Sequence, residues 1–171
     1  MAATPSGTAS AVAIKTPEDF ARVFLGAIGA PVTANNLTTV VGWEASEGGH
    51  WLNHAWYNPL NTTLVMPGSG PINGDPSQNN GHPVQAYPDW ETGVQATVKT
   101  ISAPRYKTVV ANLRRSATPP VTWASIAVSG WGTHHFTPSP GYANRSATKF
   151  SPPGPGAVSY THLTLPTICS V

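Results

Sequence analysis

Two glutamates lie one helical turn apart in the stretch of the chain that carries its most unusual residues. Glu44 and Glu47 are two of the seven acidic residues, and residues 37–63 around them hold three of the six tryptophans. A buried carboxyl has a raised pKa, because burial disfavours its charged form. Such a carboxyl can donate a proton near neutral pH, which is what a general acid does. Acid catalysis is therefore the first chemistry that these residues suggest.

The helix that would carry both glutamates is predicted over residues 37–47. Asparagines can cap its start and glycines can end it. These residues are Asn35, Asn36, Gly48 and Gly49. Helical spacing places Glu44 within the apolar stripe and Glu47 beside it. Because the helix ends directly after Glu47, we expect this carboxyl to project into a cleft, and Glu44 to bond to the backbone or to neighbouring side chains. The alternative is that both are ordinary solvated or capping glutamates.

The loop that follows, YNPLNTT at residues 57–63, contains aromatic and amide groups and no charge. Aromatic rings stack on the apolar faces of sugars, and amides hydrogen-bond to hydroxyl and N-acetyl groups. Tyr57, Asn58 and Asn61 are therefore candidate sugar ligands. The alternative is an asparagine-rich turn, which the Asn-Pro step favours.

The pattern W-x-x-x-E-G-G at residues 43–49, followed by YNPLNTT, resembles the lysozyme-like peptidoglycan hydrolases of actinobacteria and their phages. It is also similar in layout to bacterial glucosaminidases and soluble lytic transglycosylases. The resemblance covers about residues 17–132. It implies a lysozyme-like fold, with Glu47 as the general acid and the sugar-binding loop at residues 57–61.

Two further aromatic residues match positions that line the cleft in this family. Tyr87 resembles the family tyrosine that precedes the next helix, although a core tyrosine with a tethered hydroxyl is an equal alternative. Trp131, in the sequence SGWGT, resembles a late aromatic residue opposite the glutamate. The expected site therefore consists of catalytic Glu47 with substrate-binding Tyr57, Asn58, Asn61, Tyr87 and Trp131.

Cleavage of a β-1,4 glycosidic bond in peptidoglycan is the function that these residues predict, by a muramidase, an N-acetylglucosaminidase or a lytic transglycosylase. Such cleavage usually needs a base or nucleophile besides the acid. Candidates for this second group are Asp75, Asp89, Glu91 and Glu44. Asp89 is explained equally well as a helix cap. The resemblance also implies a mechanism with one glutamate, in which the N-acetyl or a hydroxyl group of the substrate assists.

Two other functions fit parts of the sequence. Glu47, His50 and His54 have the spacing E-x-x-H-x-x-x-H, and His82 or His134 and His135 could complete a zinc site of a cell-wall peptidase. The glutamate lies outside the histidine pair, however, and two glycines interrupt the helix. A non-catalytic peptidoglycan-binding or phage structural domain would keep the aromatic loop without using the acid.

The remaining pattern predicts a mainly α, lysozyme-like α+β fold with about five helices and one short β-hairpin. The helices are expected over residues 16–29, 37–47, 89–101, 104–115 and 118–130. Residues 84–87 alternate like a strand, with residues 62–66 as the expected partner. Glycine and proline exclude a long helix between residues 66 and 83.

One domain is expected at residues 16–136, because 171 residues allow a single core with tails. We expect disorder at 1–15, a Pro/Gly-rich linker at 137–157, and a non-native tail at 158–171 that resembles translated sequencing adaptor. The only cysteine, Cys169, leaves no internal disulfide.

The charge and hydropathy of the chain limit its partners. A net charge of +2 suits an anionic cell wall and is too weak to suggest nucleic acid, for which clustered lysines and arginines would be expected. No apolar run reaches the length of about 18 residues that a membrane span needs. We expect a monomer without cofactor or metal that acts at the bacterial cell wall on glycan strands. The N-terminus is a poor signal peptide, and a phage lysin that leaves the cell through a membrane pore would need none.

Overall fold

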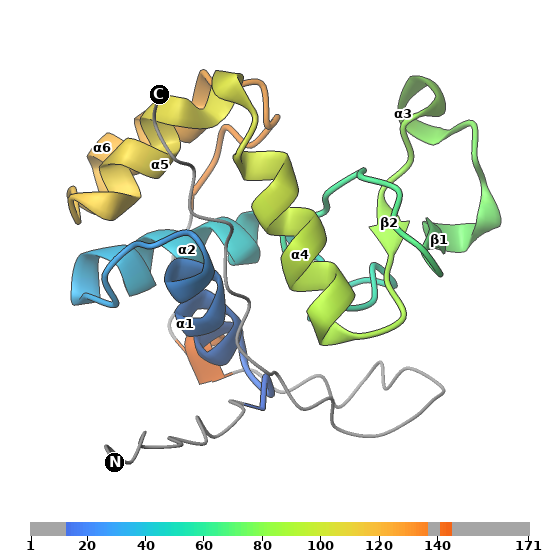
Figure 1. The fold of residues 1–171 in the computed structure, drawn as a ribbon, viewed down its shortest axis with the longest axis horizontal. Helices are drawn as coiled ribbons and strands as arrows, with labels where there is room; N and C mark the ends of the chain where they lie inside the picture. The colour runs from blue at the N-terminus through green and yellow to red at the C-terminus, as the bar shows by residue number, and fades with distance from the viewer. Residues whose placement is uncertain (1–12, 137–140, 145–171) are drawn as a thin grey trace, which may run out of the picture.

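The computed structural model describes residues 13–136 and 141–144, and its chain is mainly helical with one small antiparallel sheet (Figure 1). The helices are α1 (Pro17–Ala27), α2 (Ala34–Glu47), α3 (Gln78–Gly81), α4 (Trp90–Ile101), α5 (Lys107–Arg114) and α6 (Pro119–Ala127). The strands are β1 (Gly70–Pro71) and β2 (Gln85–Ala86), and short 3-10 helices lie at Ile72–Gly74, Pro104–Tyr106 and Tyr142–Asn144. The predicted mainly α fold with one short hairpin is thus confirmed. The five longer helices correspond to the five expected ones, whereas α3 is a single turn with two left-handed residues.

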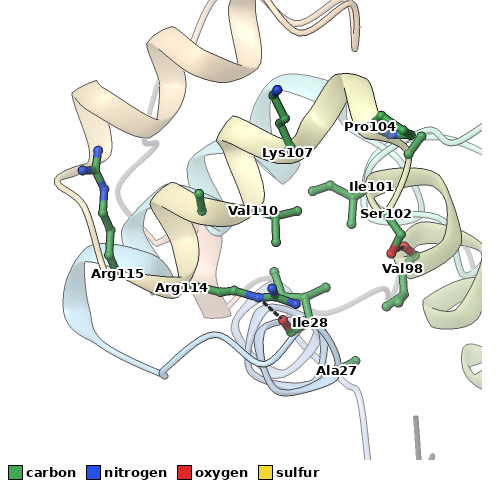
Figure 2. A pocket seen from close by; sticks show the side chains of 12 residues that line it. Ala27, Ile28, Val98, Ile101, Ser102, Pro104, Lys107, Val110, Arg114 and Arg115 are labelled. Carbon is green, nitrogen blue, oxygen red and sulfur yellow. Dashed lines mark hydrogen bonds between the residues drawn. The ribbon is translucent and has the colours of Figure 1, made fainter. Parts of the chain in front are cut away.

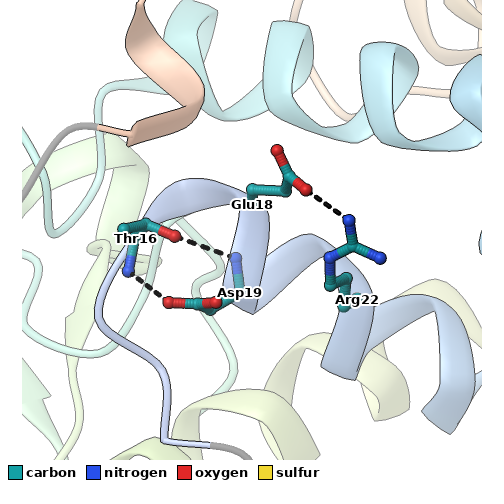
Figure 3. Close-up of polar contacts among 4 residues, drawn as sticks. All are labelled: Thr16, Glu18, Asp19 and Arg22. Carbon is teal, nitrogen blue, oxygen red and sulfur yellow. Dashed lines mark hydrogen bonds and ion pairs between the residues drawn. The ribbon is translucent and has the colours of Figure 1, made fainter.

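The start of α1 follows from its sequence. The Thr16 hydroxyl accepts a hydrogen bond from the Asp19 N–H, and the Asp19 carboxylate accepts one from the Thr16 N–H, which is a capping box (Figure 3). Glu18 and Arg22 pair one turn apart on the exposed side of the helix. Such a surface pair contributes little to stability. The reciprocal cap is the stronger determinant of where α1 begins.

The start of α2 was predicted wrongly. The helix begins at Ala34, and the Thr33 hydroxyl caps it by accepting from the Asn36 N–H. The Asn36 side chain is buried and donates to the carbonyl oxygens of Pro31 and Leu113, 2.7 and 2.8 Å away. This asparagine therefore joins α2 to α5 instead of capping its own helix.

The core lies between the five longer helices. Its largest fully buried side chains are Phe20, Phe24, Leu25, Trp43, Leu60, Ile101, Leu113 and Ile126. In Figure 1, α1, α2, α5 and α6 form a helical body, and α4 separates this body from a smaller part that contains α3, β1 and β2. Among the described residues, no helix has the length and apolar character needed to cross a bilayer.

The sheet has a different partner from the one expected. β2 pairs with β1, with Gly70 opposite Ala86 and Pro71 opposite Gln85, so the pairing with residues 62–66 was wrong as a strand ladder. One backbone bond still joins the two segments, from the Gln85 N–H to the Thr62 carbonyl at 3.1 Å. Proline at 67 and glycine at 68 turn the chain before β1, and this turn brings the glycine-rich segment back beside β2.

Packing extends slightly beyond the predicted domain limits. Ile14, expected in the N-terminal segment, is buried in the core. Tyr142, expected in the linker, is also buried, and its hydroxyl donates to the Glu44 carbonyl oxygen at 3.1 Å. The helical unit therefore includes residues on both sides of 16–136. The rest of the predicted linker and the tail at 158–171 lie outside the described residues.

Candidate functional site

Glu47 is the last residue of α2 and is partly exposed. Gly48 follows in the left-handed conformation (φ 68°), which ends the helix directly after the glutamate. The Thr133 hydroxyl donates a hydrogen bond to Glu47 Oε1. Trp43 Nε1 in turn donates to Thr133 Oγ1 at 3.2 Å. The carboxyl is therefore held at the helix end by a residue 86 positions later in the chain.

The surroundings of Glu47 act on its pKa in opposite directions. Burial raises the pKa of this carboxyl above its ordinary value. Hydrogen bonds from Thr133, Asn61 and Trp43 lower it again in part, because they favour the charged form. The net pKa is raised, so the group keeps its proton at higher pH than an exposed glutamate does. This is the property that a general acid requires.

Glu44, one turn earlier, lies in the core. Its side chain is fully buried, and Glu44 Oε2 accepts from Trp51 Nε1 at 2.8 Å. The other oxygen, Oε1, has no hydrogen-bond partner among the described residues. Burial raises the pKa of Glu44 well above the ordinary range. A group without surface exposure cannot contact a polysaccharide, so Glu44 is not a candidate second catalytic group.

The second glycine of the E-G-G motif explains how the loop approaches the helix end. A Cβ atom at Gly49 would overlap the carbonyl oxygen of Asn58, and it would also crowd Asn61 Oδ1. Only glycine leaves room for this contact between residues 49 and 58–61. The pairing of E-G-G with YNPLNTT in the sequence thus has a packing reason.

Asn58 does not face solvent, so its predicted contact with a sugar is corrected. Its side chain is fully buried, and its Nδ2 donates to the carbonyl oxygens of Thr62 and Gln85 at 2.8 and 2.7 Å. Its Oδ1 accepts from the Thr62 N–H at 2.8 Å. These bonds occupy the amide and tie the loop to β2. Asn58 shapes the site without touching its occupant.

Asn61 joins the loop to the glutamate. It is partly buried with a positive φ of 52°, and its Nδ2 donates to the Glu47 carbonyl oxygen at 2.6 Å. Asparagine tolerates this left-handed conformation better than most residues. The structure therefore brings Asn61 to the predicted catalytic residue, where it could also reach a substrate.

Tyr57 is partly exposed and also has a positive φ, of 55°. Its ring packs edge-on against Trp90 with centroids 5.2 Å apart. Its carbonyl oxygen lies so close to α4 that a Cβ at Gly93 would overlap it. Burial and the nearby Asp89 carboxylate raise the pKa of Tyr57. The turn, with its strained backbone, holds the Tyr57 ring at the edge of an aromatic cluster, and Tyr57 stays partly exposed there.

Tyr87 takes the alternative role of a core tyrosine with a tethered hydroxyl, so its place in the substrate-binding set is corrected. It is 3% exposed, and its hydroxyl lies 2.7 Å from Thr62 Oγ1 and donates to the Leu64 carbonyl at 2.8 Å. Burial raises the pKa of Tyr87 to about 12. Its hydroxyl joins residues 62–64, at the end of the loop, to the chain directly after β2.

Trp131 is partly exposed and packs against Trp43 of α2 and Leu60 of the loop. Its indole N–H donates to the Leu60 carbonyl at 3.2 Å, and its ring meets Trp43 edge-on with centroids 4.7 Å apart. The segment 131–133 thus contacts the loop through Trp131 and the glutamate through Thr133. The sequence pointed to Trp131. Thr133 and Trp43 lie within the quoted motifs but were not predicted as site residues, because no local pattern indicates a contact between residues so far apart in the chain.

The other proposed second carboxylates have local structural partners. Asp75 is exposed and accepts from the Ser77 N–H and hydroxyl, and these bonds lower its pKa. Asp89 caps α4 by accepting from the Thr92 N–H at 2.8 Å, as its capping alternative predicted. Glu91 accepts from Gln95 Nε2 at 3.3 Å. Each bond explains its carboxylate without a catalytic role.

The arrangement of the described histidines and acidic residues does not favour the alternative of a zinc site. Within the described residues, no three histidine, cysteine or acidic side chains come together as metal ligands. His50 is buried among aromatic rings, and its Nδ1 accepts from the Tyr57 N–H at 2.8 Å. Burial lowers the pKa of His50 to about 4. This imidazole supports the turn at Tyr57 with one of its two nitrogens.

Comparison with known proteins found no relative, because no protein-family model, curated protein or solved structure matches this chain. The functional assignment therefore depends on the sequence motifs and on the geometry around Glu47.

Proposed function

We propose that this protein cleaves the glycan strand of peptidoglycan at a β-1,4 glycosidic bond, with Glu47 as the general acid. The observation that carries the proposal is the placement of this carboxyl. It stands partly exposed at a helix end, its pKa is raised by burial, and Thr133 holds it in place. These three properties together are what acid catalysis needs.

Partly exposed residues of the loop at 57–63 and of the segment at 131–133 support a neutral polysaccharide as the substrate. Tyr57, Asn61 and Trp131 are partly exposed, and they supply two aromatic surfaces and one amide. Aromatic rings and amides suit sugar rings and N-acetyl groups. The motif resemblance to lysozyme-like hydrolases narrows this polysaccharide to peptidoglycan.

In the proposed reaction the protonated Glu47 donates its proton to the glycosidic oxygen. The bond between the anomeric carbon and that oxygen breaks, and its electron pair leaves with the departing sugar. Positive charge then develops at the anomeric carbon. We propose that the substrate's own N-acetyl or hydroxyl oxygen attacks this carbon, since the four candidate carboxylates have structural partners or are buried. Attack by the sugar's own hydroxyl releases an anhydro-sugar and returns that hydroxyl's proton to Glu47. In the N-acetyl case, water later attacks the anomeric carbon, the bond from that carbon to the N-acetyl oxygen breaks, and one proton of the water returns to Glu47. This step restores the N-acetyl group and yields a new reducing end.

The experiment measures the loss of turbidity of purified actinobacterial peptidoglycan, followed by mass spectrometry of the soluble products. Glu47→Gln keeps the size of the side chain and removes the acid, so we expect the rate to fall by about 10²–10⁴-fold. Glu18→Gln is the matched control, because Glu18 lies on the exposed side of α1 and pairs only locally with Arg22. Asp75→Asn should clear the wall like wild type.

The products distinguish the two chemistries. A new reducing end identifies hydrolysis, and the loss of one water identifies an anhydro-sugar. Wild-type turnover by Glu47→Gln would refute the assignment of the acid. If neither protein clears the wall while both sediment with it, the domain is a binding module and Glu47 has a structural role.

A further inference from the structure

Two features of the fold lie apart from the residues around Glu47. One is a hollow of about 670 Å³ between α1, α4 and α5 (Figure 2). At its rim, Arg114 Nε already donates to the Ile28 carbonyl at 3.0 Å, and the Lys107 amine points away from the hollow. Neither group therefore offers a free charge to a ligand inside it. The other feature is the single-turn helix α3, whose last two residues can react with each other.

These two residues, Asn80 and Gly81, form one of the two Asn-Gly steps in the chain. Helix α3 lies at the outer edge of the smaller part of the molecule, away from the helical body (Figure 1). Both residues are exposed. The backbone nitrogen that follows an asparagine can attack the side-chain amide, and glycine obstructs this nitrogen least because it has no Cβ. The step at 80–81 thus has both reacting groups in contact with water.

The side-chain amide of Asn80 is not held by the fold. Within residues 13–136 and 141–144 it has no hydrogen-bond partner. A bonded amide is restrained from turning towards the next backbone nitrogen, whereas the Asn80 amide can rotate freely. Seven other asparagines in these ranges do form side-chain hydrogen bonds, namely Asn35, Asn36, Asn53, Asn58, Asn61, Asn79 and Asn112.

The backbone at Asn80 is also weakly held. Asn79, Asn80 and Gly81 have positive φ values of 50°, 55° and 81°, a conformation that residues other than glycine seldom adopt. The Gly81 N–H donates only to the Ser77 carbonyl, over a long 3.4 Å. A ring between the side chain and the Gly81 nitrogen requires rotation about the Asn80 Cα–C bond, which opens this turn. One long hydrogen bond and a strained backbone oppose that opening little.

We propose that Asn80 is a site of spontaneous deamidation, which converts it to aspartate and isoaspartate through a cyclic imide. Hydroxide removes the Gly81 N–H proton, and the nitrogen attacks Asn80 Cγ to close a five-membered ring. Such an intramolecular attack is favoured by the proximity of the two groups. The bond between Cγ and Nδ2 breaks, and Nδ2 takes a proton from water and leaves as ammonia, which regenerates the hydroxide.

Water then opens the ring at one of its two carbonyl carbons, and the ring nitrogen takes a proton from that water. Attack at Cγ breaks the new bond and gives aspartate. Attack at the main-chain carbonyl carbon breaks its bond to the Gly81 nitrogen and gives isoaspartate, in which the main chain runs through the former side chain. In sum, one water is consumed and one ammonia is released. Either product adds a carboxylate to a chain whose formal net charge is +2, and neither depends on activity towards peptidoglycan.

Incubation of the full, folded chain in mildly alkaline buffer tests the proposal. Samples taken over several days are digested and analysed by mass spectrometry, with separation of the aspartate and isoaspartate peptides. We expect both products at residue 80, formed at least about tenfold faster than any product at Asn79, whose amide donates to the His82 carbonyl and which no glycine follows.

Two matched glycine variants test the reaction partner. Gly81→Ala should slow the conversion of residue 80 about tenfold, because the added Cβ crowds the attacking nitrogen. Gly74→Ala changes the glycine of the other Asn-Gly step and should leave the rate at residue 80 unchanged. Both glycines have a positive φ and open space for a Cβ, so the two substitutions strain the backbone alike.

Three results would overturn the proposal. Residue 80 could stay an asparagine in the folded chain and convert only when the chain is unfolded in urea, which would show that α3 protects it. Asn79 could react as fast as Asn80, or the two alanine variants could slow residue 80 equally. Conversion in the folded chain that Gly81→Ala alone slows would support it.

Discussion

The two sides of the last turn of α2 place the same residue type in different surroundings. On the inner side, Glu44 is fully buried, bonds to Trp51 and leaves one oxygen without a partner among the described residues. On the outer side, Glu47 is partly exposed and receives a hydrogen bond from Thr133. Burial raises the pKa of both carboxyls. A raised pKa alone therefore does not identify a catalytic acid, and access is the second requirement.

The boundary between the two sides is made by glycine. Gly48 ends the helix and Gly49 admits the loop, so that the chain folds back over the helix end and leaves Glu47 at its edge. Glu44, covered by Trp51 and by the hydroxyl of Tyr142 on its backbone, stays inside. This contrast yields four predictions, which test whether the outer side is built for access and the inner side for stability.

The largest effect is expected at Gly49. Gly49→Ala places a Cβ against the Asn58 carbonyl oxygen, and the backbone must move to relieve the overlap. We expect a loss of about 3 kcal/mol in the free energy of unfolding, measured by urea denaturation. Gly26→Ala is the matched control, because a Cβ there meets nothing within 4 Å and alanine favours the helix. It should gain up to about 1 kcal/mol. Equal stabilities of the two variants would mean that the loop does not rest on the helix end.

The second prediction compares two asparagines of the loop, the buried Asn58 and the partly exposed Asn61. Asn58→Ala leaves the Gln85 carbonyl and the Thr62 N–H without their buried partners, so we expect it to lose about 2–3 kcal/mol of stability. Asn61→Ala removes a partly exposed amide that bonds to the Glu47 backbone, and should lose only about 1 kcal/mol.

Thermal melts and wall-clearing rates of the two variants measure both properties. At a temperature where both are folded, Asn61→Ala should have the lower activity of the two. The opposite order would place Asn58 at the substrate and would restore its predicted role.

The sequence predicts well those features that depend on neighbouring residues. Thr16, Pro17 and Asp19 form the cap they indicate, and the E-G-G motif ends α2 where expected. It does not predict which of two adjacent polar residues is buried, because burial depends on distant contacts. The buried amide of Asn36 donates to the Leu113 carbonyl, and the buried amide of Asn58 donates to the Gln85 carbonyl.

The site shows the same limit. The local pattern predicted Glu47 at the helix end and Asn61 in the loop beside it, and the resemblance pointed to Trp131, but the same pattern also included Asn58, which is buried. Thr133 could not be found in this way, because a single threonine after a glycine has no special pattern, and its partner lies 86 residues earlier. Tyr87 was predicted to contact the substrate, with a core tyrosine as the alternative, and its bonds to Thr62 and Leu64 favour the alternative.

The third prediction tests how Glu47 is held. Thr133→Val removes the hydroxyl that favours the charged carboxyl, so the pKa of Glu47 should rise further. Activity that requires the protonated acid falls as pH rises through this pKa, and the alkaline limb of the profile should therefore move to higher pH. Loss of orientation should also lower the maximal rate by about three- to tenfold.

The wall-clearing rate as a function of pH measures both effects, with Thr133→Ser as the control that keeps the hydroxyl. Thr133→Val also leaves the buried indole N–H of Trp43 without its acceptor, so a stability loss of about 1–2 kcal/mol is expected. An alkaline limb that stays in place in the valine variant would show that Thr133 does not act on the acid.

The fourth prediction concerns Glu44, where the expected effect on activity is the smallest and the effect on stability depends on pH. Because the pKa of Glu44 is raised by burial, the folded chain keeps a proton there at pH values where the unfolded chain has released it. The stability of the wild type should therefore fall as pH rises from the ordinary glutamate range towards that raised pKa, by up to about 1.4 kcal/mol per pH unit. Glu44→Gln does not titrate and should lack this slope, while wall clearing is retained.

His50 and Glu47 also change their protonation with pH, so the experiment must separate their contributions to stability from that of Glu44. His50 has its pKa lowered to about 4, so the unfolded chain binds the extra proton between that value and the ordinary histidine pKa, and stability rises with pH across this window. Glu47 contributes a slope of the same sign as Glu44. Both groups are present in wild type and in Glu44→Gln, so they cancel in the difference between the two urea-unfolding free energies. That difference should move in favour of the variant as pH rises, and a difference that stays constant would place Glu44 outside the core.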